Sequence, residues 1–252
     1  MIFDIGRGAG YLARGFTIMK SSGIRRYVIM PLLLNVLLFG GLVWFGYSQL
    51  SALIDWMLAG VPSWLGFLEG LIWMFISFMA VFIVFFTFTP VANVVAAPFN
   101  AIMAEKIEEQ LTGEDINSGV ALSSIIIDSI KSQLGKLLYI LLWSAGLFLI
   151  GLIPVINLIS PALWIIFGAW LLTLEYMDYP MGNHDLPFAR QKERIKSRRG
   201  LALGFGGAVM VMTSIPLVNF LVMPMAVAGA TVMWVEQLRE KGGALADTGD
   251  IS

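Results

Sequence analysis

Long apolar segments without any charge alternate along this chain with shorter and more polar segments. Residues 27–50 carry no charged side chain, and they exceed the roughly 20 residues that a helix needs to cross a bilayer. A second apolar run, rich in Phe, begins near residue 71, and Pro90 and Pro98 predict that it continues as a kinked helix. The pattern therefore predicts two long membrane helices, over residues 27–50 and 71–112, joined by an external connection at residues 51–70.

Two other segments show the period of an amphipathic helix. In residues 3–20 the apolar positions recur at spacings of three and four, and the basic residues lie off that stripe. Residues 120–134 repeat the arrangement. Because such helices lie in the plane of the membrane surface, we expect both segments to be interfacial. The apolar positions are Ile5, Ala9, Leu12, Phe16 and Met19 in the first segment and Leu122, Ile126, Ile130 and Leu134 in the second.

A motif of Pro and Asn occurs twice, each time between two apolar arms. The first copy contains Pro154 and Asn157, the second contains Pro216 and Asn219, and a further proline closes each copy. Proline lacks an N–H and clashes with the preceding turn, so no continuous helix is expected through either copy, including its closing proline, Pro161 or Pro224. We therefore predict two helical hairpins, over residues 137–177 and 201–240, with the Pro and Asn residues at their tips.

The predicted hairpin arms are short for a membrane. At 1.5 Å per residue they reach roughly 17–26 Å, against a hydrocarbon core of about 30 Å. Re-entrant hairpins that enter the membrane only partly are therefore favoured over four short true spans. Paired helix breaks in corresponding places of a repeat are typical of transport proteins. The expected fold is an all-α integral membrane protein forming a single membrane domain over residues 1–252.

Composition and charge placement support this interpretation. The chain is 58% hydrophobic and only 13% charged, and its absence of cysteine excludes disulfides and thiolate metal sites. Lys and Arg cluster before residue 27, at residues 106–136, at residues 190–199 and after residue 238, whereas the connection and both tips carry none. By the positive-inside rule, both termini are expected to be cytoplasmic in a multi-pass protein of the bacterial inner membrane. The N-terminal residues do not indicate a signal peptide.

An anion site is one interpretation of Gly23-Ile24-Arg25-Arg26, which precedes the first long helix. A helix N-terminus presents free N–H groups and the positive end of the helix dipole, and glycine lets an anion approach the backbone. Guanidinium groups add paired hydrogen bonds to an oxyanion. The alternative is that the cytoplasmic start of a membrane helix collects arginines for topology alone. From the residues themselves both interpretations stay open.

Three further groups of residues have both a functional and a structural interpretation. The basic run at residues 190–199 could bind lipid head groups or anions, or could simply be solvated. A cluster that includes Asp178, Asn183 and His184 could be a metal or acid–base site, although a hydrogen-bonded turn is favoured. Asn93, Asn100 and Glu105 could line a polar conduction path or join helices to one another. Towards the end of this helix, Glu105, Lys106, Glu108 and Glu109 are expected to emerge into water.

Two segments of the chain carry a family resemblance. One contains the sequence Tyr-Met-Asp-Tyr-Pro-Met-Gly-Asn-His at residues 176–184, and the other contains Ala-Pro-Phe-Asn at residues 97–100. Together with the basic stretch after residue 189, they resemble the bacterial CysZ sulfate permeases, and the similarity covers almost the whole chain. The resemblance implies sulfate entry through the inner membrane for cysteine synthesis, two long helices with two partly inserted hairpins, and a homo-oligomer.

The resemblance also bears on the anion site. The family's Gly-Leu-Arg sulfate motif falls on Gly23, Ile24 and Arg25, with Arg26 adjacent, and it makes sulfate binding the favoured interpretation there. The expected function is a channel-like permease rather than an enzyme, without cofactor, metal or nucleic-acid partner. A sulfate–proton symporter stays open, although no acid or histidine relay is evident within the membrane segments. An interfacial enzyme using His184 and Asp185 on anionic lipid, and a non-conducting scaffold, are the alternatives from other classes.

Overall fold

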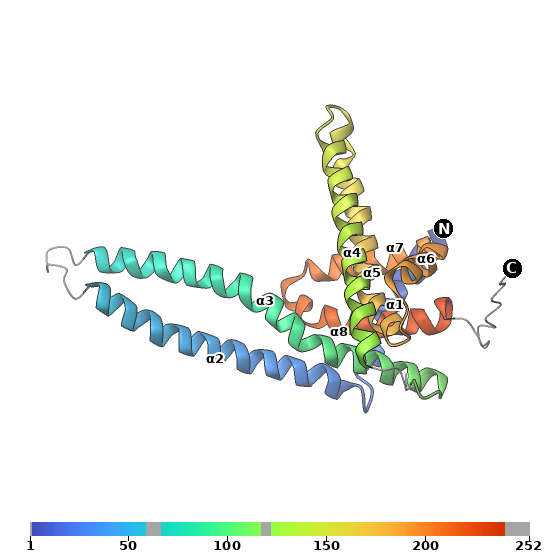
Figure 1. Ribbon diagram of the computed structural model, residues 1–252, viewed down its shortest axis with the longest axis horizontal. Coiled ribbons are helices and arrows are strands. Elements are labelled where there is room, and N and C mark those ends of the chain that lie inside the picture. The colour runs from blue at the N-terminus through green and yellow to red at the C-terminus, as the bar shows by residue number, and fades with distance from the viewer. Residues whose placement is uncertain (1, 59–66, 117–121, 240–252) are drawn as a thin grey trace. The chain divides into compact units, whose positions relative to one another are not determined.

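The computed structural model describes residues 2–58, 67–116 and 122–239, and every regular element in these ranges is a helix (Figure 1). This confirms the prediction of an all-α protein. The elements are α1 (Ile2–Ile18), α2 (Arg25–Leu58), α3 (Phe67–Thr112), α4 (Leu122–Gly151), the 3₁₀ turn η2 (Ile156–Leu158), α5 (Ser160–Gly182), α6 (Phe188–Ser197), α7 (Arg199–Thr213), α8 (Pro216–Met233) and the π-helical turn η3 (Trp234–Leu238).

The chain forms two compact units. One comprises Met1–Arg25 and Asn100–Ser252, and the other comprises Arg26–Phe99. The second unit consists of most of α2 and the first part of α3, which meet where the rings of Tyr47 and Trp73 lie with centroids 6.3 Å apart. Apolar side chains of both helices are widely exposed, as membrane helices require. They include Trp44, Phe45, Phe75 and Phe78.

The first unit has its core where α1, α5, α7 and α8 pack together. Two glycines let α1 and α7 approach until their backbones touch. A Cβ added to Gly8 would lie 2.1 Å from the carbonyl oxygen of Leu201, and one added to Gly204 would lie 2.0 Å from that of Ile5. The buried face of α1 is therefore formed by small residues as well as apolar ones. Ile5 and Phe16, which belong to the predicted apolar stripe, are exposed.

Several predicted boundaries were wrong. Residues 120–134 do not form a separate interfacial helix, because α4 runs without a break from Leu122 to Gly151 and Gly135 alone does not end it. The connection predicted at residues 51–70 is partly helical, since α2 extends to Leu58 and α3 begins at Phe67. Residues 59–66, which include Trp64, lie outside the described residues.

The arms of the first hairpin are longer than predicted. Helices α4 and α5 have 30 and 23 residues, or about 45 and 34 Å, and they lie side by side in Figure 1. By contrast α7 has 15 residues, about 22 Å, which is less than the membrane core of about 30 Å. In the described residues, four stretches are long and apolar enough to cross a membrane: Arg25–Ala52, Gln133–Gly151, Ser160–Gly182 and Val218–Leu238.

The two Pro and Asn motifs differ in position, because the first lies between its arms and the second begins an arm. Pro154 and Asn157 belong to the turn that joins α4 to α5, where the backbone N–H of Asn157 donates to the carbonyl oxygen of Ile153. Pro216 is the first residue of α8, and Asn219 lies in that helix's first turn. The closing proline of the second copy does not break the helix as predicted, because α8 continues through Pro224 to Met233. A proline removes one backbone hydrogen bond from a helix, and the packing of the remaining residues can keep the helix continuous.

Candidate functional site

The loop between α1 and α2 has a shape that requires glycine. Gly23 has φ +96°, in the left-handed region that side chains rarely adopt, whereas a Cβ there would lie at an ordinary 3.7 Å from Nε2 of Gln110. The next side chain, Ile24, is fully buried and holds the loop against the first unit. The backbone N–H groups of Ile24 and Arg25 both donate to the carbonyl oxygen of Ser21. The conformation of the predicted anion motif is thus set by backbone and packing.

The two arginines of this motif have exposed side chains at the start of α2. Arg25 is the first residue of the helix, and Arg26 is the first residue of the second unit. The guanidinium of Arg26 donates a 2.9 Å hydrogen bond to the hydroxyl of Tyr27 and lies 4.8 Å from the centre of that ring. Free N–H groups of a first helical turn, beside exposed guanidinium groups, suit a hydrated oxyanion.

Glu108, near the end of α3, is fully buried, which corrects the expectation that it emerges into water. Its Oε1 atom lies 2.9 Å from Nε2 of His184, accepts a 3.1 Å hydrogen bond from the indole of Trp234 and lies 3.3 Å from Nε of Arg239. Its Oε2 atom has no hydrogen-bond partner among the described residues. The structure thus contains a buried acid next to a histidine, which no local pattern indicated because His184 and Trp234 are 76 and 126 residues away.

The predicted turn cluster divides between two sets of partners. Asp178 receives a 2.8 Å hydrogen bond from Nε2 of Gln191 in α6 and lies 3.3 Å from Nζ of Lys136 in α4. Asn183 caps α5 and donates from Nδ2 to the carbonyl oxygen of Ala101, so its side chain ties α5 to α3. Within the described ranges, no three His, Asp or Glu side chains form a group that could hold a metal ion.

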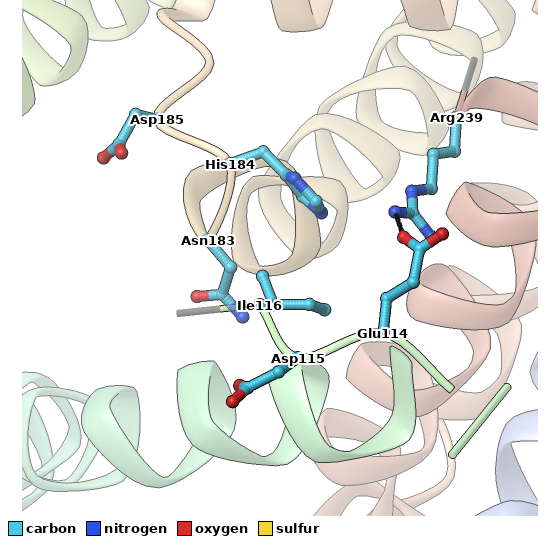
Figure 2. Close-up of a pocket in the computed structure, with 7 residues that line it drawn as sticks. All are labelled: Glu114, Asp115, Ile116, Asn183, His184, Asp185 and Arg239. Carbon is cyan, nitrogen blue, oxygen red and sulfur yellow. Dashed lines mark hydrogen bonds and ion pairs between the residues drawn. The ribbon is translucent and has the colours of Figure 1, made fainter. Parts of the chain in front are cut away.

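A cavity of about 310 Å³ is lined by His184 and Arg239, two of the contacts of Glu108 (Figure 2). Arg239 reaches from the end of η3 to pair with Glu114, while the carboxylate of Asp185 is turned away from that pair. Three carboxylates and one guanidinium make this cavity a poor trap for free anions unless Arg239 exchanges its partner. Its lining residues are Glu114, Asp115, Ile116, Asn183, His184, Asp185 and Arg239.

The residues of the predicted conduction path belong to both units, Asn93 to the second and Asn100 and Glu105 to the first. Asn100 is 2% exposed and its Nδ2 atom lacks a hydrogen-bond partner among the described residues. Glu105 lies 3.1 Å from Nζ of the adjacent Lys106, which also pairs with Glu109. Asn93 belongs to α3 in the second unit, and its side chain lies outside the described residues.

These features define an all-helical, multi-pass membrane protein with an arginine-bearing loop before its first long helix. The chain belongs to the family described as Sulfate transporter CysZ/Etoposide-induced protein 2.4, whose model matches residues 11–224. The family resemblance drawn from the sequence is thereby confirmed, and so is the expectation of a transport protein rather than an enzyme.

Individual relatives match over nearly the whole chain. A sulfate transporter CysZ of Pseudomonas fluorescens is 39% identical over 238 residues, which cover 93% of this chain and 94% of the relative. That of Vibrio parahaemolyticus is also 39% identical, over 93% of this chain and 96% of the relative. That of Pseudomonas syringae pv. tomato is 40% identical, over 93% of both chains.

Proposed function

We propose that this chain is a channel-like sulfate permease of the bacterial inner membrane that supplies sulfate for cysteine synthesis. The observation that carries the proposal is the loop at Gly23, whose left-handed backbone and buried Ile24 hold two exposed arginines at a helix N-terminus. The relatives are named sulfate transporters, and the chain matches them over 93% of its length. Both termini would be cytoplasmic, and the functional form would be a homo-oligomer in the bilayer.

Sulfate capture would occur at the first turn of α2. Backbone N–H groups of that turn and the guanidinium groups of Arg25 and Arg26 would bind the dianion while it keeps much of its water. Because both side chains are exposed, the binding would be weak enough for release, as conduction requires. A path along α3 past Asn93, Asn100 and Glu105 would follow, with partly inserted hairpins enclosing it and Phe side chains of α3 as a hydrophobic constriction.

The deciding experiment is radiolabelled sulfate uptake into liposomes that contain the purified chain. The variant Arg25→Ala/Arg26→Ala should lose uptake, while the matched variant Arg7→Ala/Lys20→Ala, which removes two exposed cations of the neighbouring segment, should keep it. Uptake that survives in the first variant would remove the anion site and leave the permease. Absence of uptake by folded wild-type protein would reject transport itself.

A second candidate, a sulfate–proton symporter, is favoured by the buried pair of Glu108 and His184. The sequence shows no acid and histidine relay within its membrane segments. The structure brings Glu108 and His184 within 2.9 Å, outside the described stretches that are long and apolar enough to cross a membrane. The Oε2 atom of Glu108 has no hydrogen-bond partner among the described residues, so it is the atom at which a transported proton would bind. An inward proton gradient should then raise the uptake rate of wild type but not that of Glu108→Gln. Equal rates with and without the gradient would leave the channel.

A further inference from the structure

Helix α6 has one face fixed inside the first unit. Phe188, Gln191 and Ile195 are buried, and Nε2 of Gln191 donates to Asp178 and to the carbonyl oxygen of Leu186 at 2.8 and 2.9 Å. This face cannot insert into a membrane because it already packs against the protein. Any partner of α6 must therefore bind its opposite, outward face.

Not all cations of this region are available to a partner. The Arg194 guanidinium lies 5.4 Å from the Trp234 ring and donates to the carbonyl oxygen of Leu238, while Lys192 lies 5.0 Å from the Tyr139 ring. Both side chains are thus used in internal contacts. The remaining four cations are exposed, two in α6 and two where it joins α7, and together we call them the α6 basic face: Arg190, Lys196, Arg198 and Arg199.

The α6 basic face has little compensating negative charge. Glu193 lies 3.7 Å from Arg190, but both side chains are more than 70% exposed, so the pair is weak. Among the described residues, no carboxylate lies within ion-pair distance of Lys196, Arg198 or Arg199. Arg198 and Arg199 also stand at the N-terminus of α7, where cations oppose the helix dipole. Their charges therefore do not stabilise α7 and are available to an external anion.

The position of α6 along the chain specifies where that anion lies. The helix begins six residues after α5, which is long and apolar enough to cross a membrane, and it ends directly before the apolar α7. A helix that follows a membrane-crossing stretch within six residues is expected near the boundary between hydrocarbon and water. Head groups of phospholipids are the anions concentrated at this boundary.

We propose that the α6 basic face binds the head groups of anionic phospholipids and so fixes the point at which α7 enters the membrane. The short α7, about 22 Å long, cannot reach from one membrane surface to the other, so head groups bound at its start would add to its packing against α1 and α5 in fixing its depth. Each cation near an anionic membrane surface contributes about fivefold to binding. Removal of two should therefore lower the preference for anionic lipid by about 25-fold.

The test is native mass spectrometry of the full chain released from membranes with equal amounts of phosphatidylglycerol and phosphatidylcholine. Wild type should retain phosphatidylglycerol preferentially. Arg198→Gln/Arg199→Gln should lose most of that preference, whereas Arg198→Lys/Arg199→Lys and the control Arg7→Gln/Lys20→Gln should keep it. If the Gln variant does not fold, the wild-type preference is followed in rising salt, where it should fall as exposed charges are screened.

Three outcomes would overturn the proposal. Wild type with no preference for phosphatidylglycerol would show that the face does not select anionic lipid. An equal loss in the Lys variant would show that the arginines act through their packing instead of their charge. Binding of a soluble polyanion such as a double-stranded oligonucleotide, with no effect of the lipid composition, would assign the face to a different partner.

Discussion

Substitution of Gly206 by alanine should destabilise the first unit, and the structure gives the reason. A Cβ at this position in α7 would lie 1.7 Å from the carbonyl oxygen of Ala169 in α5, where ordinary contacts begin at 3.4 Å, and 2.6 Å from Oγ1 of Thr173. The obstructing oxygen belongs to a helix backbone and cannot rotate away. Helices α5 and α7 would have to separate by more than 1 Å, on the order of the shortfall in that contact.

The magnitude follows from the contacts that this separation would affect. Overpacking against backbone costs about 3 kcal/mol, at the upper end of its usual range. The buried hydroxyl of Thr173 donates a 2.6 Å hydrogen bond to the carbonyl oxygen of Ala202 in α7, and its loss adds about 1 kcal/mol. Replacing glycine by alanine in a helix returns about 1 kcal/mol. The net destabilisation is therefore about 3 kcal/mol, equivalent to a fall in Tm of about 6–12 °C for a chain of this length.

The adjacent Gly207 provides a matched control in the same helix. A Cβ there meets nothing within 4 Å, so Gly207→Ala keeps only the gain in helix propensity. We expect its Tm in detergent to equal or exceed that of wild type, with Gly206→Ala well below both in the same thermal scans. Equal Tm values for the two variants would refute the close approach of α5 and α7 described here.

Three other predictions concern single contacts. Glu108→Leu should lower the free energy of unfolding by about 2–4 kcal/mol, because it leaves His184 and the Trp234 indole without their buried acceptor. Glu108→Gln should lower it less, and equal Tm values for the two variants would show that the acceptor contributes nothing. Gly23→Ala should strain the left-handed backbone by about 1–2 kcal/mol and weaken sulfate affinity in an equilibrium binding measurement. Unchanged affinity would show that sulfate binding does not depend on the conformation of this loop. Arg14 and Glu236 form an ion pair with two contacts, at 2.5 and 2.7 Å, but both side chains are more than one third exposed. A double-mutant cycle should therefore give a coupling energy of about 1 kcal/mol or less, and a coupling energy of about 3 kcal/mol would contradict this reasoning.

The sequence predicted the helices well where apolar runs were long and uninterrupted. Residues 27–50 fall inside α2 and residues 71–112 fall inside α3, because length without charge is a strong signal for a membrane helix. Breaks were harder to predict. The continuity of α4 and the passage of α8 through Pro224 depend on packing that supports the helix, and no local residue pattern reports such packing.

The polar contacts were predicted only in part. The segment at residues 176–184 indicated a hydrogen-bonded turn, and Asn183 does cap α5, but its partner Ala101 is 82 residues away. The burial of Glu108 could not be predicted at all. Its neighbours Lys106 and Glu109 form ion pairs at the protein surface, so this stretch of α3 resembles a solvated helix end in sequence. Only the tertiary arrangement, which brings His184 and Trp234 to one carboxylate oxygen, makes burial possible.

The contacts at the end of α3 explain why a Glu108 variant can distinguish the channel mechanism from the symporter mechanism, whereas the arginine variants cannot. Glu108 faces His184 and Trp234, whereas Gln110, two residues further along and therefore on another side of the helix, lies beside Gly23. One turn of α3 thus carries the buried acid and also contacts the loop that precedes α2. Loss of Arg25 and Arg26 is expected to abolish sulfate capture under either proposed mechanism. A change at Glu108 leaves the loop's own residues intact, so a variant that still binds sulfate but no longer responds to a proton gradient would assign the coupling to the buried pair.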